Sequence, residues 1–222
     1  MKKRTVLSQR KLPRYSRGEE IMNMVTHIVG GALAIIILIL CLCKSWGLGR
    51  SMAASFIYGL TMVCLYTFSS IYHGLLPCTA KKVMQIIDHC TIYFLIVGTY
   101  TAVLLPGIIP VHPVIGWALL AAEWTLAIIA TVLTAIDLHN YRVFSMICYI
   151  AMGWGIILFI PQTLQVLSLP GFLYLLSGGI AYTIGAVLFG IGSKIPWIHS
   201  VFHIFVVLGS LLQFICIYFY VI

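Results

Sequence analysis

Acidic residues are almost absent from this sequence. Only 5 of its 222 residues are aspartate or glutamate, and charged residues of both signs make up 8% of the chain, against 62% hydrophobic residues. Such a chain cannot cover a water-facing surface with polar side chains, so the composition excludes a soluble globular domain. It predicts an integral membrane protein.

The sequence also lacks a Cys-x-x-Cys pair, although it has 7 cysteines. All but Cys78 lie inside long apolar runs, where cysteine packs as a small core residue. Cys78 lies in a short connection that we expect to face the reducing cytoplasm. Cysteine therefore indicates neither a disulfide framework nor a thiolate metal site.

Apolar runs long enough to cross a bilayer, about 20 residues as a helix, recur along the chain. We expect an all-helical, polytopic fold: a basic segment at residues 1–20, then one domain of seven transmembrane helices at residues 21–222. The expected helices cover residues 21–43, 51–75, 83–105, 114–135, 142–160, 170–191 and 199–221. The connections between them are short, which leaves no room for a second domain.

Basic residues gather on one side of this expected bundle. Seven of the 13 lie within the first 17 positions, and four more fall on the same side: Lys81, Lys82, Arg142 and Lys194. The opposite side has only Lys44 and Arg50. The positive-inside bias predicts a cytoplasmic N-terminus and an outer C-terminus, in the plasma membrane. Topology and anionic lipid thus explain the net charge of +8 without nucleic acid as a partner.

Two histidines one helical turn apart, His199 and His203, begin the last expected helix and share one of its faces. Imidazoles in lipid are costly without partners, so the pair suggests a metal or a proton path. Contacts with lipid headgroups would also explain it. His73 ends the second helix at the same cytoplasmic depth. Three imidazoles with an open fourth position are typical of catalytic Zn²⁺, although iron, manganese or copper would also suit them.

Two further polar residues lie at this depth. Asp88 is near the start of the third helix, and Ser69 is one turn before His73 on the second. Asp88 could act as a general base or orient an activated water, and Ser69 could hydrogen-bond that water or help to bind an oxyanion. Asp88 and Ser69 are therefore the predicted catalytic residues, beside metal ligands His73, His199 and His203.

The first helix adds a polar stripe, because Glu20, Asn23 and His27 follow an i, i+3, i+7 pattern. We expect these three to support the site from behind the ligands or to serve as structural polar residues. His27 is alternatively a fourth ligand. The stretch from Ser16 to Glu19 predicts a helix capping box.

Along nearly its whole length the chain resembles the haemolysin III family, the bacterial branch of the progestin and adipoQ receptor family. The resemblance rests on three motifs: Glu20 with Asn23 and His27, Ser69 and His73 followed by Asp88, and His199 with His203. It implies seven helices with a cytoplasmic N-terminus. It also implies zinc at His73, His199 and His203, with a water between the metal and Asp88. In related eukaryotic receptors this site is associated with hydrolysis of ceramide-like lipid amides.

Three functions remain open at this point. The first is a metal-dependent hydrolase acting on amide or ester bonds of a membrane lipid. The second is a membrane-homeostasis sensor or receptor whose zinc is structural, and the third is a pore-forming haemolysin, as the family name suggests. A membrane lipid is the expected partner, as substrate or ligand. The sequence offers no amphipathic pore-forming segment.

Overall fold

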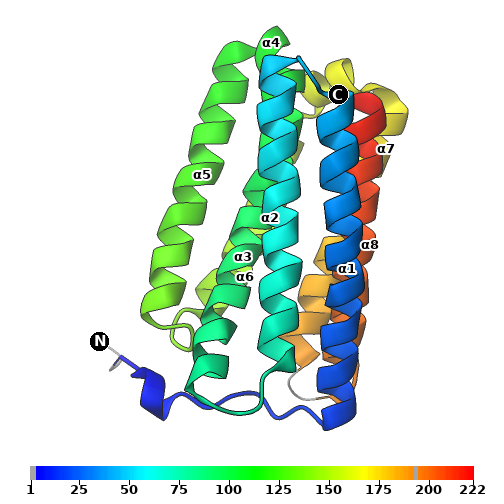
Figure 1. Cartoon of the computed structure of the whole chain (residues 1–222). Coiled ribbons are helices and arrows are strands. Elements are labelled where there is room, and N and C mark those ends of the chain that lie inside the picture. Colours follow the sequence, from blue (N-terminus) through cyan, green and yellow to red (C-terminus); the bar gives the residue numbers. More distant parts are fainter. Residues whose placement is uncertain (1–3, 193–194) are drawn as a thin grey trace.

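The computed structural model describes residues 4–192 and 195–222, and this part of the chain is helical, without strands. Its α-helices are α1 (Arg17–Lys44), α2 (Gly49–Gly74), α3 (Thr79–Val103), α4 (Ile109–Val111), α5 (Pro113–Ile136), α6 (Arg142–Trp154), α7 (Ile160–Gly192) and α8 (Ile198–Tyr220) (Figure 1). Shorter pieces are a 3₁₀ turn η1 (Leu7–Gln9), a π-helical turn η2 (Leu104–Ile108) and a 3₁₀ turn η3 (Gly155–Phe159). The prediction of an all-helical fold is confirmed for these residues. Lys2, Lys3 and Lys194, which entered the charge argument, lie outside them.

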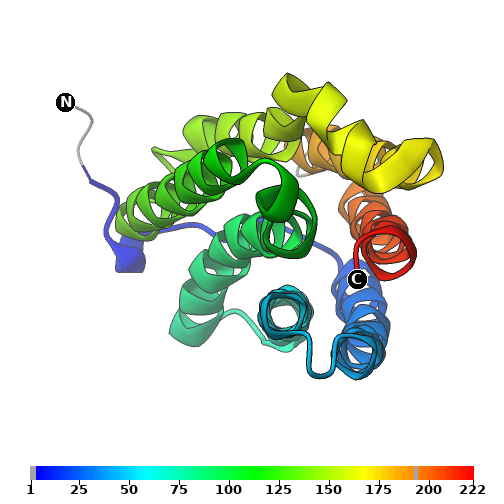
Figure 2. The ribbon, with the colours of Figure 1, turned by 90° about the horizontal axis from the view of Figure 1, so that it is seen from above.

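The helices pack around one another in a ring (Figure 2). α1 contacts both α2 and α8, α2 contacts α3, α3 contacts α5, and α7 packs along α8. The apolar stretch that contains α3 is the most enclosed: 72% of an 18-residue apolar window in it is buried, against 44% or less in the corresponding windows of the others. Because α1, α2, α3 and α8 are neighbours, polar residues on them can meet inside the bundle.

Six helical stretches among the described residues are long and apolar enough to cross a membrane. Seven were expected, and this count does not confirm that number. The difference lies in Arg142–Gly192, expected as two helices and found as one helical stretch of 51 residues. It is interrupted by η3 and by Ser168, whose φ of 56° and ψ of 169° are not helical, two residues before Pro170.

The stretch Arg142–Gly192 does not run straight. A straight helix of its length would measure about 77 Å, more than twice the roughly 30 Å hydrocarbon core of a bilayer. Figure 1 shows instead that its middle (yellow) lies at the same end of the bundle as the C-terminus, while its last turns (orange) lie near the opposite end. The break at Ser168 thus allows the chain to reverse.

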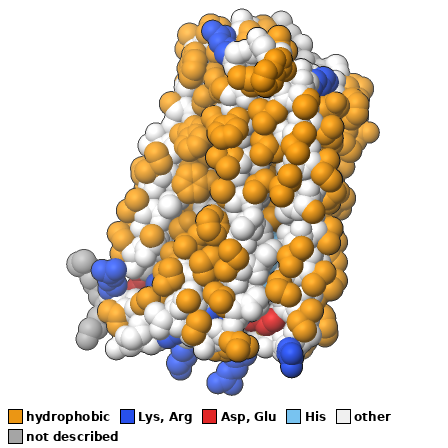
Figure 3. Space-filling model, viewed as in Figure 1, with side chains coloured by type: hydrophobic (Ala, Val, Ile, Leu, Met, Phe, Trp, Pro, Cys, Tyr) orange, Lys and Arg blue, Asp and Glu red, His pale blue; other side chains and the backbone are white. Residues whose placement is uncertain are grey.

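The outer surface is apolar. Figure 3 shows hydrophobic side chains over the length of the bundle and lysine and arginine at its two ends. Ile35 and Ile39 on α1 and Ile128 and Val132 on α5 are each about half exposed. Lipid, not water, suits such a surface. The protein is therefore a multi-pass membrane protein. The N-terminal segment and the C-terminus lie at opposite ends (Figure 1), and which end is cytoplasmic remains a prediction from charge.

A capping box begins α1, as the sequence predicts. The Oγ of Ser16 accepts the N–H of Glu19 at 3.2 Å, and Oε2 of Glu19 accepts the N–H of Ser16 at 2.8 Å. Oε1 of Glu19 also accepts the N–H of Trp197 at 2.7 Å, where a left-handed φ of 67° precedes α8. Glu19 therefore joins the starts of α1 and α8 and sets the polar residues of both helices at one level.

Candidate metal centre

Three buried histidines meet at one end of the bundle. His73 comes from the last turn of α2, and His199 and His203 come from the first two turns of α8. One ring nitrogen of each lies within 4.8 Å of the other two. The Nε2 atoms of His199 and His203 face each other at 3.2 Å. The predicted trio is therefore assembled in the structure, in a cluster that could hold a metal ion.

Two of the three histidines are held through their other ring nitrogen. Nδ1 of His73 lies 2.6 Å from Oε2 of Glu20, and Nδ1 of His203 lies 3.2 Å from the backbone oxygen of Asn23. Both partners are acceptors, so each imidazole donates its Nδ1–H and keeps the Nε2 lone pair for a ligand. Carboxylates and carbonyls hold metal-binding histidines in this way.

The donor set fits a metal. Nε2 of His73 is buried and has no hydrogen-bond partner among the described residues. A buried nitrogen left without a partner is costly, and a metal would satisfy it. Three neutral imidazoles supply three of the four positions of a tetrahedral zinc site. Asp88 and His27 do not belong to the cluster, so the described residues leave a fourth position without a protein ligand.

Glu20 connects the trio to a lysine. Its Oε1 accepts a hydrogen bond from Nζ of Lys81 at 2.7 Å, while its Oε2 holds His73. Lys81 is itself buried, and its Nζ also donates to the backbone oxygen of Leu75 at 2.8 Å. The ammonium keeps Glu20 ionised and in place, which favours donation of Nδ1–H from His73.

Asn23 is the second support, and it is completely buried. Its backbone oxygen holds His203, and its side-chain Oδ1 accepts the hydroxyl of Ser200 at 2.6 Å. Its Nδ2 lies 3.4 Å from Nδ1 of His73. One residue of α1 thus contacts two of the three histidines and α8, which fixes the relative rotation of α1, α2 and α8.

His27 lies against the trio without belonging to it. Its ring stacks on that of His203, with centroids 3.7 Å apart and 19° between the planes, and packs against Tyr66 in a T-shaped contact. Neither ring nitrogen of His27 has a hydrogen-bond partner among the described residues. This arrangement does not support His27 as a fourth ligand, because its nitrogens fall outside the cluster.

Asp88 and Ser69 lie beside the trio. The Ser69 hydroxyl and the His73 ring are both close enough to the Asp88 carboxyl to interact with it electrostatically. Both residues line the same cavity as His199 and His203. A carboxyl near three imidazoles, but not among them, can accept a proton from a water placed between.

Tyr15 covers the trio from the N-terminal segment. Its ring stacks on His199, with centroids 4.8 Å apart and 21° between the planes, and lies 6.0 Å from the ring of His73. Burial, with Glu20 and Asp88 nearby, raises the pKa of the Tyr15 phenol, so the ring stays neutral at physiological pH. The segment that precedes α1 is therefore part of the site.

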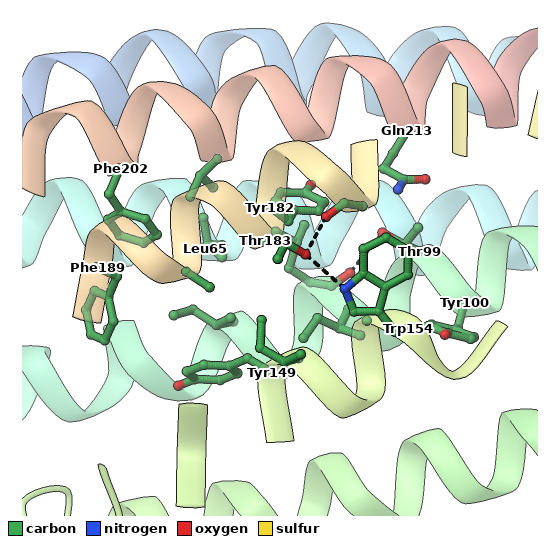
Figure 4. A pocket seen from close by; sticks show the side chains of 18 of the residues that line it. Leu65, Thr99, Tyr100, Tyr149, Trp154, Tyr182, Thr183, Phe189, Phe202 and Gln213 are labelled. Atoms are coloured by element: carbon green, nitrogen blue, oxygen red, sulfur yellow. Dashed lines mark hydrogen bonds between the residues drawn. The ribbon is translucent and has the colours of Figure 1, made fainter. Parts of the chain in front are cut away.

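A cavity of about 150 Å³ extends into the bundle from His199 and His203. His27, Ser69, Asp88, His199 and His203 line its polar end. Phe189 and Phe202 follow, and the cavity continues past Tyr149 toward Tyr100 and Gln213 (Figure 4). Its walls are mostly aromatic and aliphatic, so it suits an apolar chain with its polar group at the histidines.

The sequence did not predict two contacts of the site. Lys81 was assigned to topology alone, because a basic residue in a connection gives no sign of its ion pair with Glu20 at 2.7 Å. Tyr15 lies in a segment without helical periodicity, where no pattern predicts a contact. The proximity of Tyr15 to the capping box, one residue before Ser16, is the only signal that could have found it.

Comparison with known proteins now decides the family. The family model described as "Haemolysin-III related" matches residues 15–214 of this chain. The chain belongs to the haemolysin-III-related family. The matched range contains every residue of the histidine trio, together with Tyr15, Asp88 and the polar stripe of α1.

Individual haemolysin-III relatives agree. The chain is 39% identical over 205 residues to "Hemolysin-3" of Bacillus cereus, covering 91% of this chain and 92% of that protein. It is 35% identical over 204 residues to "Hemolysin-3 homolog" of Bacillus subtilis (strain 168), covering 91% and 94%. A more distant similarity, 25% over 174 residues and 75% and 69% of the two chains, is to the human "Monocyte to macrophage differentiation factor".

Proposed function

We propose that this haemolysin III protein is a zinc-dependent hydrolase that cleaves an amide or ester bond of a membrane lipid. One observation carries the proposal: two members of a buried histidine trio, His199 and His203, line the polar end of an apolar cavity together with a carboxyl and a hydroxyl. A structural zinc site is closed by four protein ligands and needs no cavity. A catalytic zinc site keeps one position open, and a substrate must be able to reach it.

His73, His199 and His203 would hold the metal, with Glu20 and Asn23 behind them. Zinc bound by three imidazoles supplies Lewis acidity and lowers the pKa of water to near 7. Asp88 takes the proton of the water that adds to the carbonyl carbon. It then passes this proton to the leaving nitrogen or oxygen as the C–N or C–O bond breaks. The Ser69 hydroxyl, which lines the same cavity, would help to orient the Asp88 carboxyl or the water.

The cavity supports a lipid as the substrate. His203 and Gln213 both line it and lie ten residues apart on α8, which corresponds to about 15 Å along the helix. An acyl chain could extend through this length between aromatic and aliphatic walls, with its carbonyl at the histidines. A small polar substrate would leave these walls without a partner.

The orientation in the membrane belongs to the same proposal. The two arms on either side of Ser168 would each cross the bilayer, which gives seven crossings and places the ends of the chain on opposite sides. Basic residues then place the trio in the cytoplasmic third of the bilayer. Hydrolysis would thus occur on lipid of the inner leaflet.

Experiments can distinguish the proposed hydrolase from two alternatives, a pore and a sensor. The name of the Bacillus relatives, "Hemolysin-3", favours cytolysis. A trio of buried histidines is no part of a water-filled pore, although it would suit a sensor with structural zinc. Release of dye from liposomes without lipid cleavage would favour a pore. Unfolding of the helices upon chelation, with no lipid product, would favour a sensor.

The decisive experiment compares wild type with Asp88→Asn in detergent micelles that contain a panel of ceramides, lysophospholipids and acylglycerols. Zinc is measured by elemental mass spectrometry and products by lipid mass spectrometry. We expect about one zinc per chain in both proteins and cleavage of at least one lipid class by wild type only. Absence of zinc from carefully purified wild type, or full activity of Asp88→Asn, would contradict the proposal.

A further inference from the structure

His27 is an imidazole in contact with the trio for which the mechanism above has no use. It is 3% exposed and lines the same cavity as Ser69 and Asp88. An imidazole carries at least one N–H donor in either neutral tautomer. Neither ring nitrogen of His27 has a partner among the described residues. Burying an unpaired donor costs free energy, so its retention beside the histidine trio calls for a ligand.

The neighbours of His27 leave the cavity as the place for that ligand. On one face the ring is covered by His203 at 3.7 Å, in a nearly parallel stack that directs no nitrogen at the partner ring. Tyr66 packs against it in a T-shaped contact, but the Tyr66 hydroxyl is hydrogen-bonded to Ser210 Oγ at 2.7 Å. The cavity is the remaining side on which a hydrogen-bonding atom of a ligand can lie.

The position along α1 is also determined. Asn23 is one helical turn before His27, and its backbone oxygen holds His203. The same contact therefore fixes the metal ligand and the stacked ring of His27 as one unit. A group fixed in this way can donate a hydrogen bond without the cost of reorganisation at the moment of reaction.

We infer that His27 is a catalytic residue that donates a hydrogen bond to the oxygen of the lipid carbonyl and to the oxyanion that develops from it. This inference rests on the proposed hydrolase. In the proposed mechanism Asp88 accepts and returns the proton, with Ser69 beside it. His27 stabilises the negative charge on the carbonyl oxygen. Such donors are the usual means of stabilising tetrahedral intermediates.

The test uses full-length protein loaded with Co²⁺, whose visible spectrum reports on the geometry of the metal, and dodecylphosphonic acid as an anionic tetrahedral probe. Three variants are compared with wild type. His27→Phe keeps the ring for stacking on His203 but has no donor, whereas His27→Asn and His27→Gln keep an amide N–H. His112→Phe is the matched control, because His112 joins α4 to α5, whose junction lies at the other end of the bundle (Figure 1), and its Nε2 is hydrogen-bonded to Gln165 at 2.8 Å.

We expect His27→Phe to bind one Co²⁺ with an unchanged spectrum and to bind the phosphonate about 10- to 100-fold more weakly. One of the two amide variants should recover most of that affinity, and His112→Phe should match wild type. On any lipid that wild type cleaves, His27→Phe should lower kcat more than it raises KM.

Three results would overturn the inference. Equal phosphonate affinity in wild type and His27→Phe would show that His27 does not contact the bound anion. Loss of Co²⁺ or a changed spectrum in His27→Phe would show that the ring only supports His203. Failure of wild type to bind Co²⁺ would refute the proposed hydrolase first, and this inference with it.

Discussion

The ring of Tyr15 lies stacked on the ring of His199, 4.8 Å away and tilted by 21°. Tyr15 belongs to the segment before α1, which crosses the end of the bundle where the trio lies (Figure 1). Hydrogen bonds also hold the segment nearer its start. The backbone N–H of Thr5 donates to Asp137 at 2.6 Å, and Nζ of Lys82 donates to the backbone oxygen of Ser8 at 2.9 Å. The segment therefore closes the site on the side away from the cavity.

Replacement of Tyr15 by alanine should open this side. We expect Tyr15→Ala to lose zinc to a soluble chelator several-fold faster than wild type, because the ring that covers His199 is gone. Tyr15→Phe keeps the ring and should exchange zinc at the wild-type rate. Stopped-flow absorbance with a chromophoric chelator measures both. Equal rates in Tyr15→Ala and wild type would mean that the metal leaves by another route, such as the cavity.

Replacement of Glu20 by glutamine should weaken metal binding. The neutral amide of Glu20→Gln would be a poorer acceptor for Nδ1–H of His73, and supports of this kind are worth about 10- to 100-fold in metal affinity. The change also leaves the buried Lys81 ammonium without its carboxylate, so we expect a lower melting temperature. Competition with a chelator of known affinity and thermal melts in detergent measure the two effects.

The double variant Glu20→Gln/Lys81→Met separates these effects. Removal of both charged partners should restore much of the melting temperature, because no unpaired ammonium remains buried. It should not restore zinc affinity, because His73 still lacks its carboxylate. If affinity also returned, Glu20 would act only by neutralising Lys81.

The histidine trio could be predicted because two regularities of helices determine it. Helical spacing places His199 and His203 on one face, and topology places His73 at the same depth. The rotation of each helix about its axis follows from packing, which a single sequence does not contain. For this reason His27 could be placed at the right depth, while its exclusion from the ligand cluster could not be foreseen.

The missed contact of Lys81 has the same origin. Lys81 counts as a topological charge in sequence, yet its long side chain turns inward to Glu20. Hydropathy predicted two helices within residues 142–192. The structure has one helical stretch there with a non-helical residue, Ser168, inside it, and this neither confirms nor contradicts two membrane crossings.

The anchor at Asp137 should depend on pH. Burial alone would raise the pKa of this carboxyl, but hydrogen bonds from the backbone N–H groups of Thr5, Asn140 and His139 outweigh it and lower the pKa below its ordinary value. A lowered pKa means that the ionised form stabilises the fold above the ordinary value of about 4. This stabilisation is lost as the pH falls through the lowered value.

Asp137→Asn tests this dependence. At pH 5 to 7 the variant should melt roughly 2–4 °C below wild type, which corresponds to about 1 kcal/mol for a chain of this size. The difference should shrink as the pH falls below about 4. Metal-free protein is used, so that histidine protonation does not contribute through metal release. Lys82→Met is the control, because it removes the anchor at Ser8 without a group that titrates in this range. A difference for Asp137→Asn that stays constant throughout the acid range would contradict the assignment.

Two glycines of α7 allow the cavity to be tested as the site of the acyl chain. Gly179 lines the cavity, and a Cβ there would lie 4.0 Å from the Trp154 ring, in ordinary contact. Gly190 is exposed on the same helix, and a Cβ there would meet nothing within 4 Å. Valine at either position has a similar effect on helix formation, but only Gly179→Val fills the cavity.

Gly179→Val should therefore discriminate against long chains. We expect the ratio of kcat/KM for a hexadecanoyl substrate to that for a hexanoyl substrate to fall about 10-fold, since one or two methyl groups in a close-fitting apolar site are worth this much. Gly190→Val should keep the wild-type ratio. Lipid mass spectrometry of mixed-chain substrates measures both variants in one reaction. An equal loss on both chain lengths in Gly179→Val would place the acyl chain outside the cavity, in the surrounding lipid.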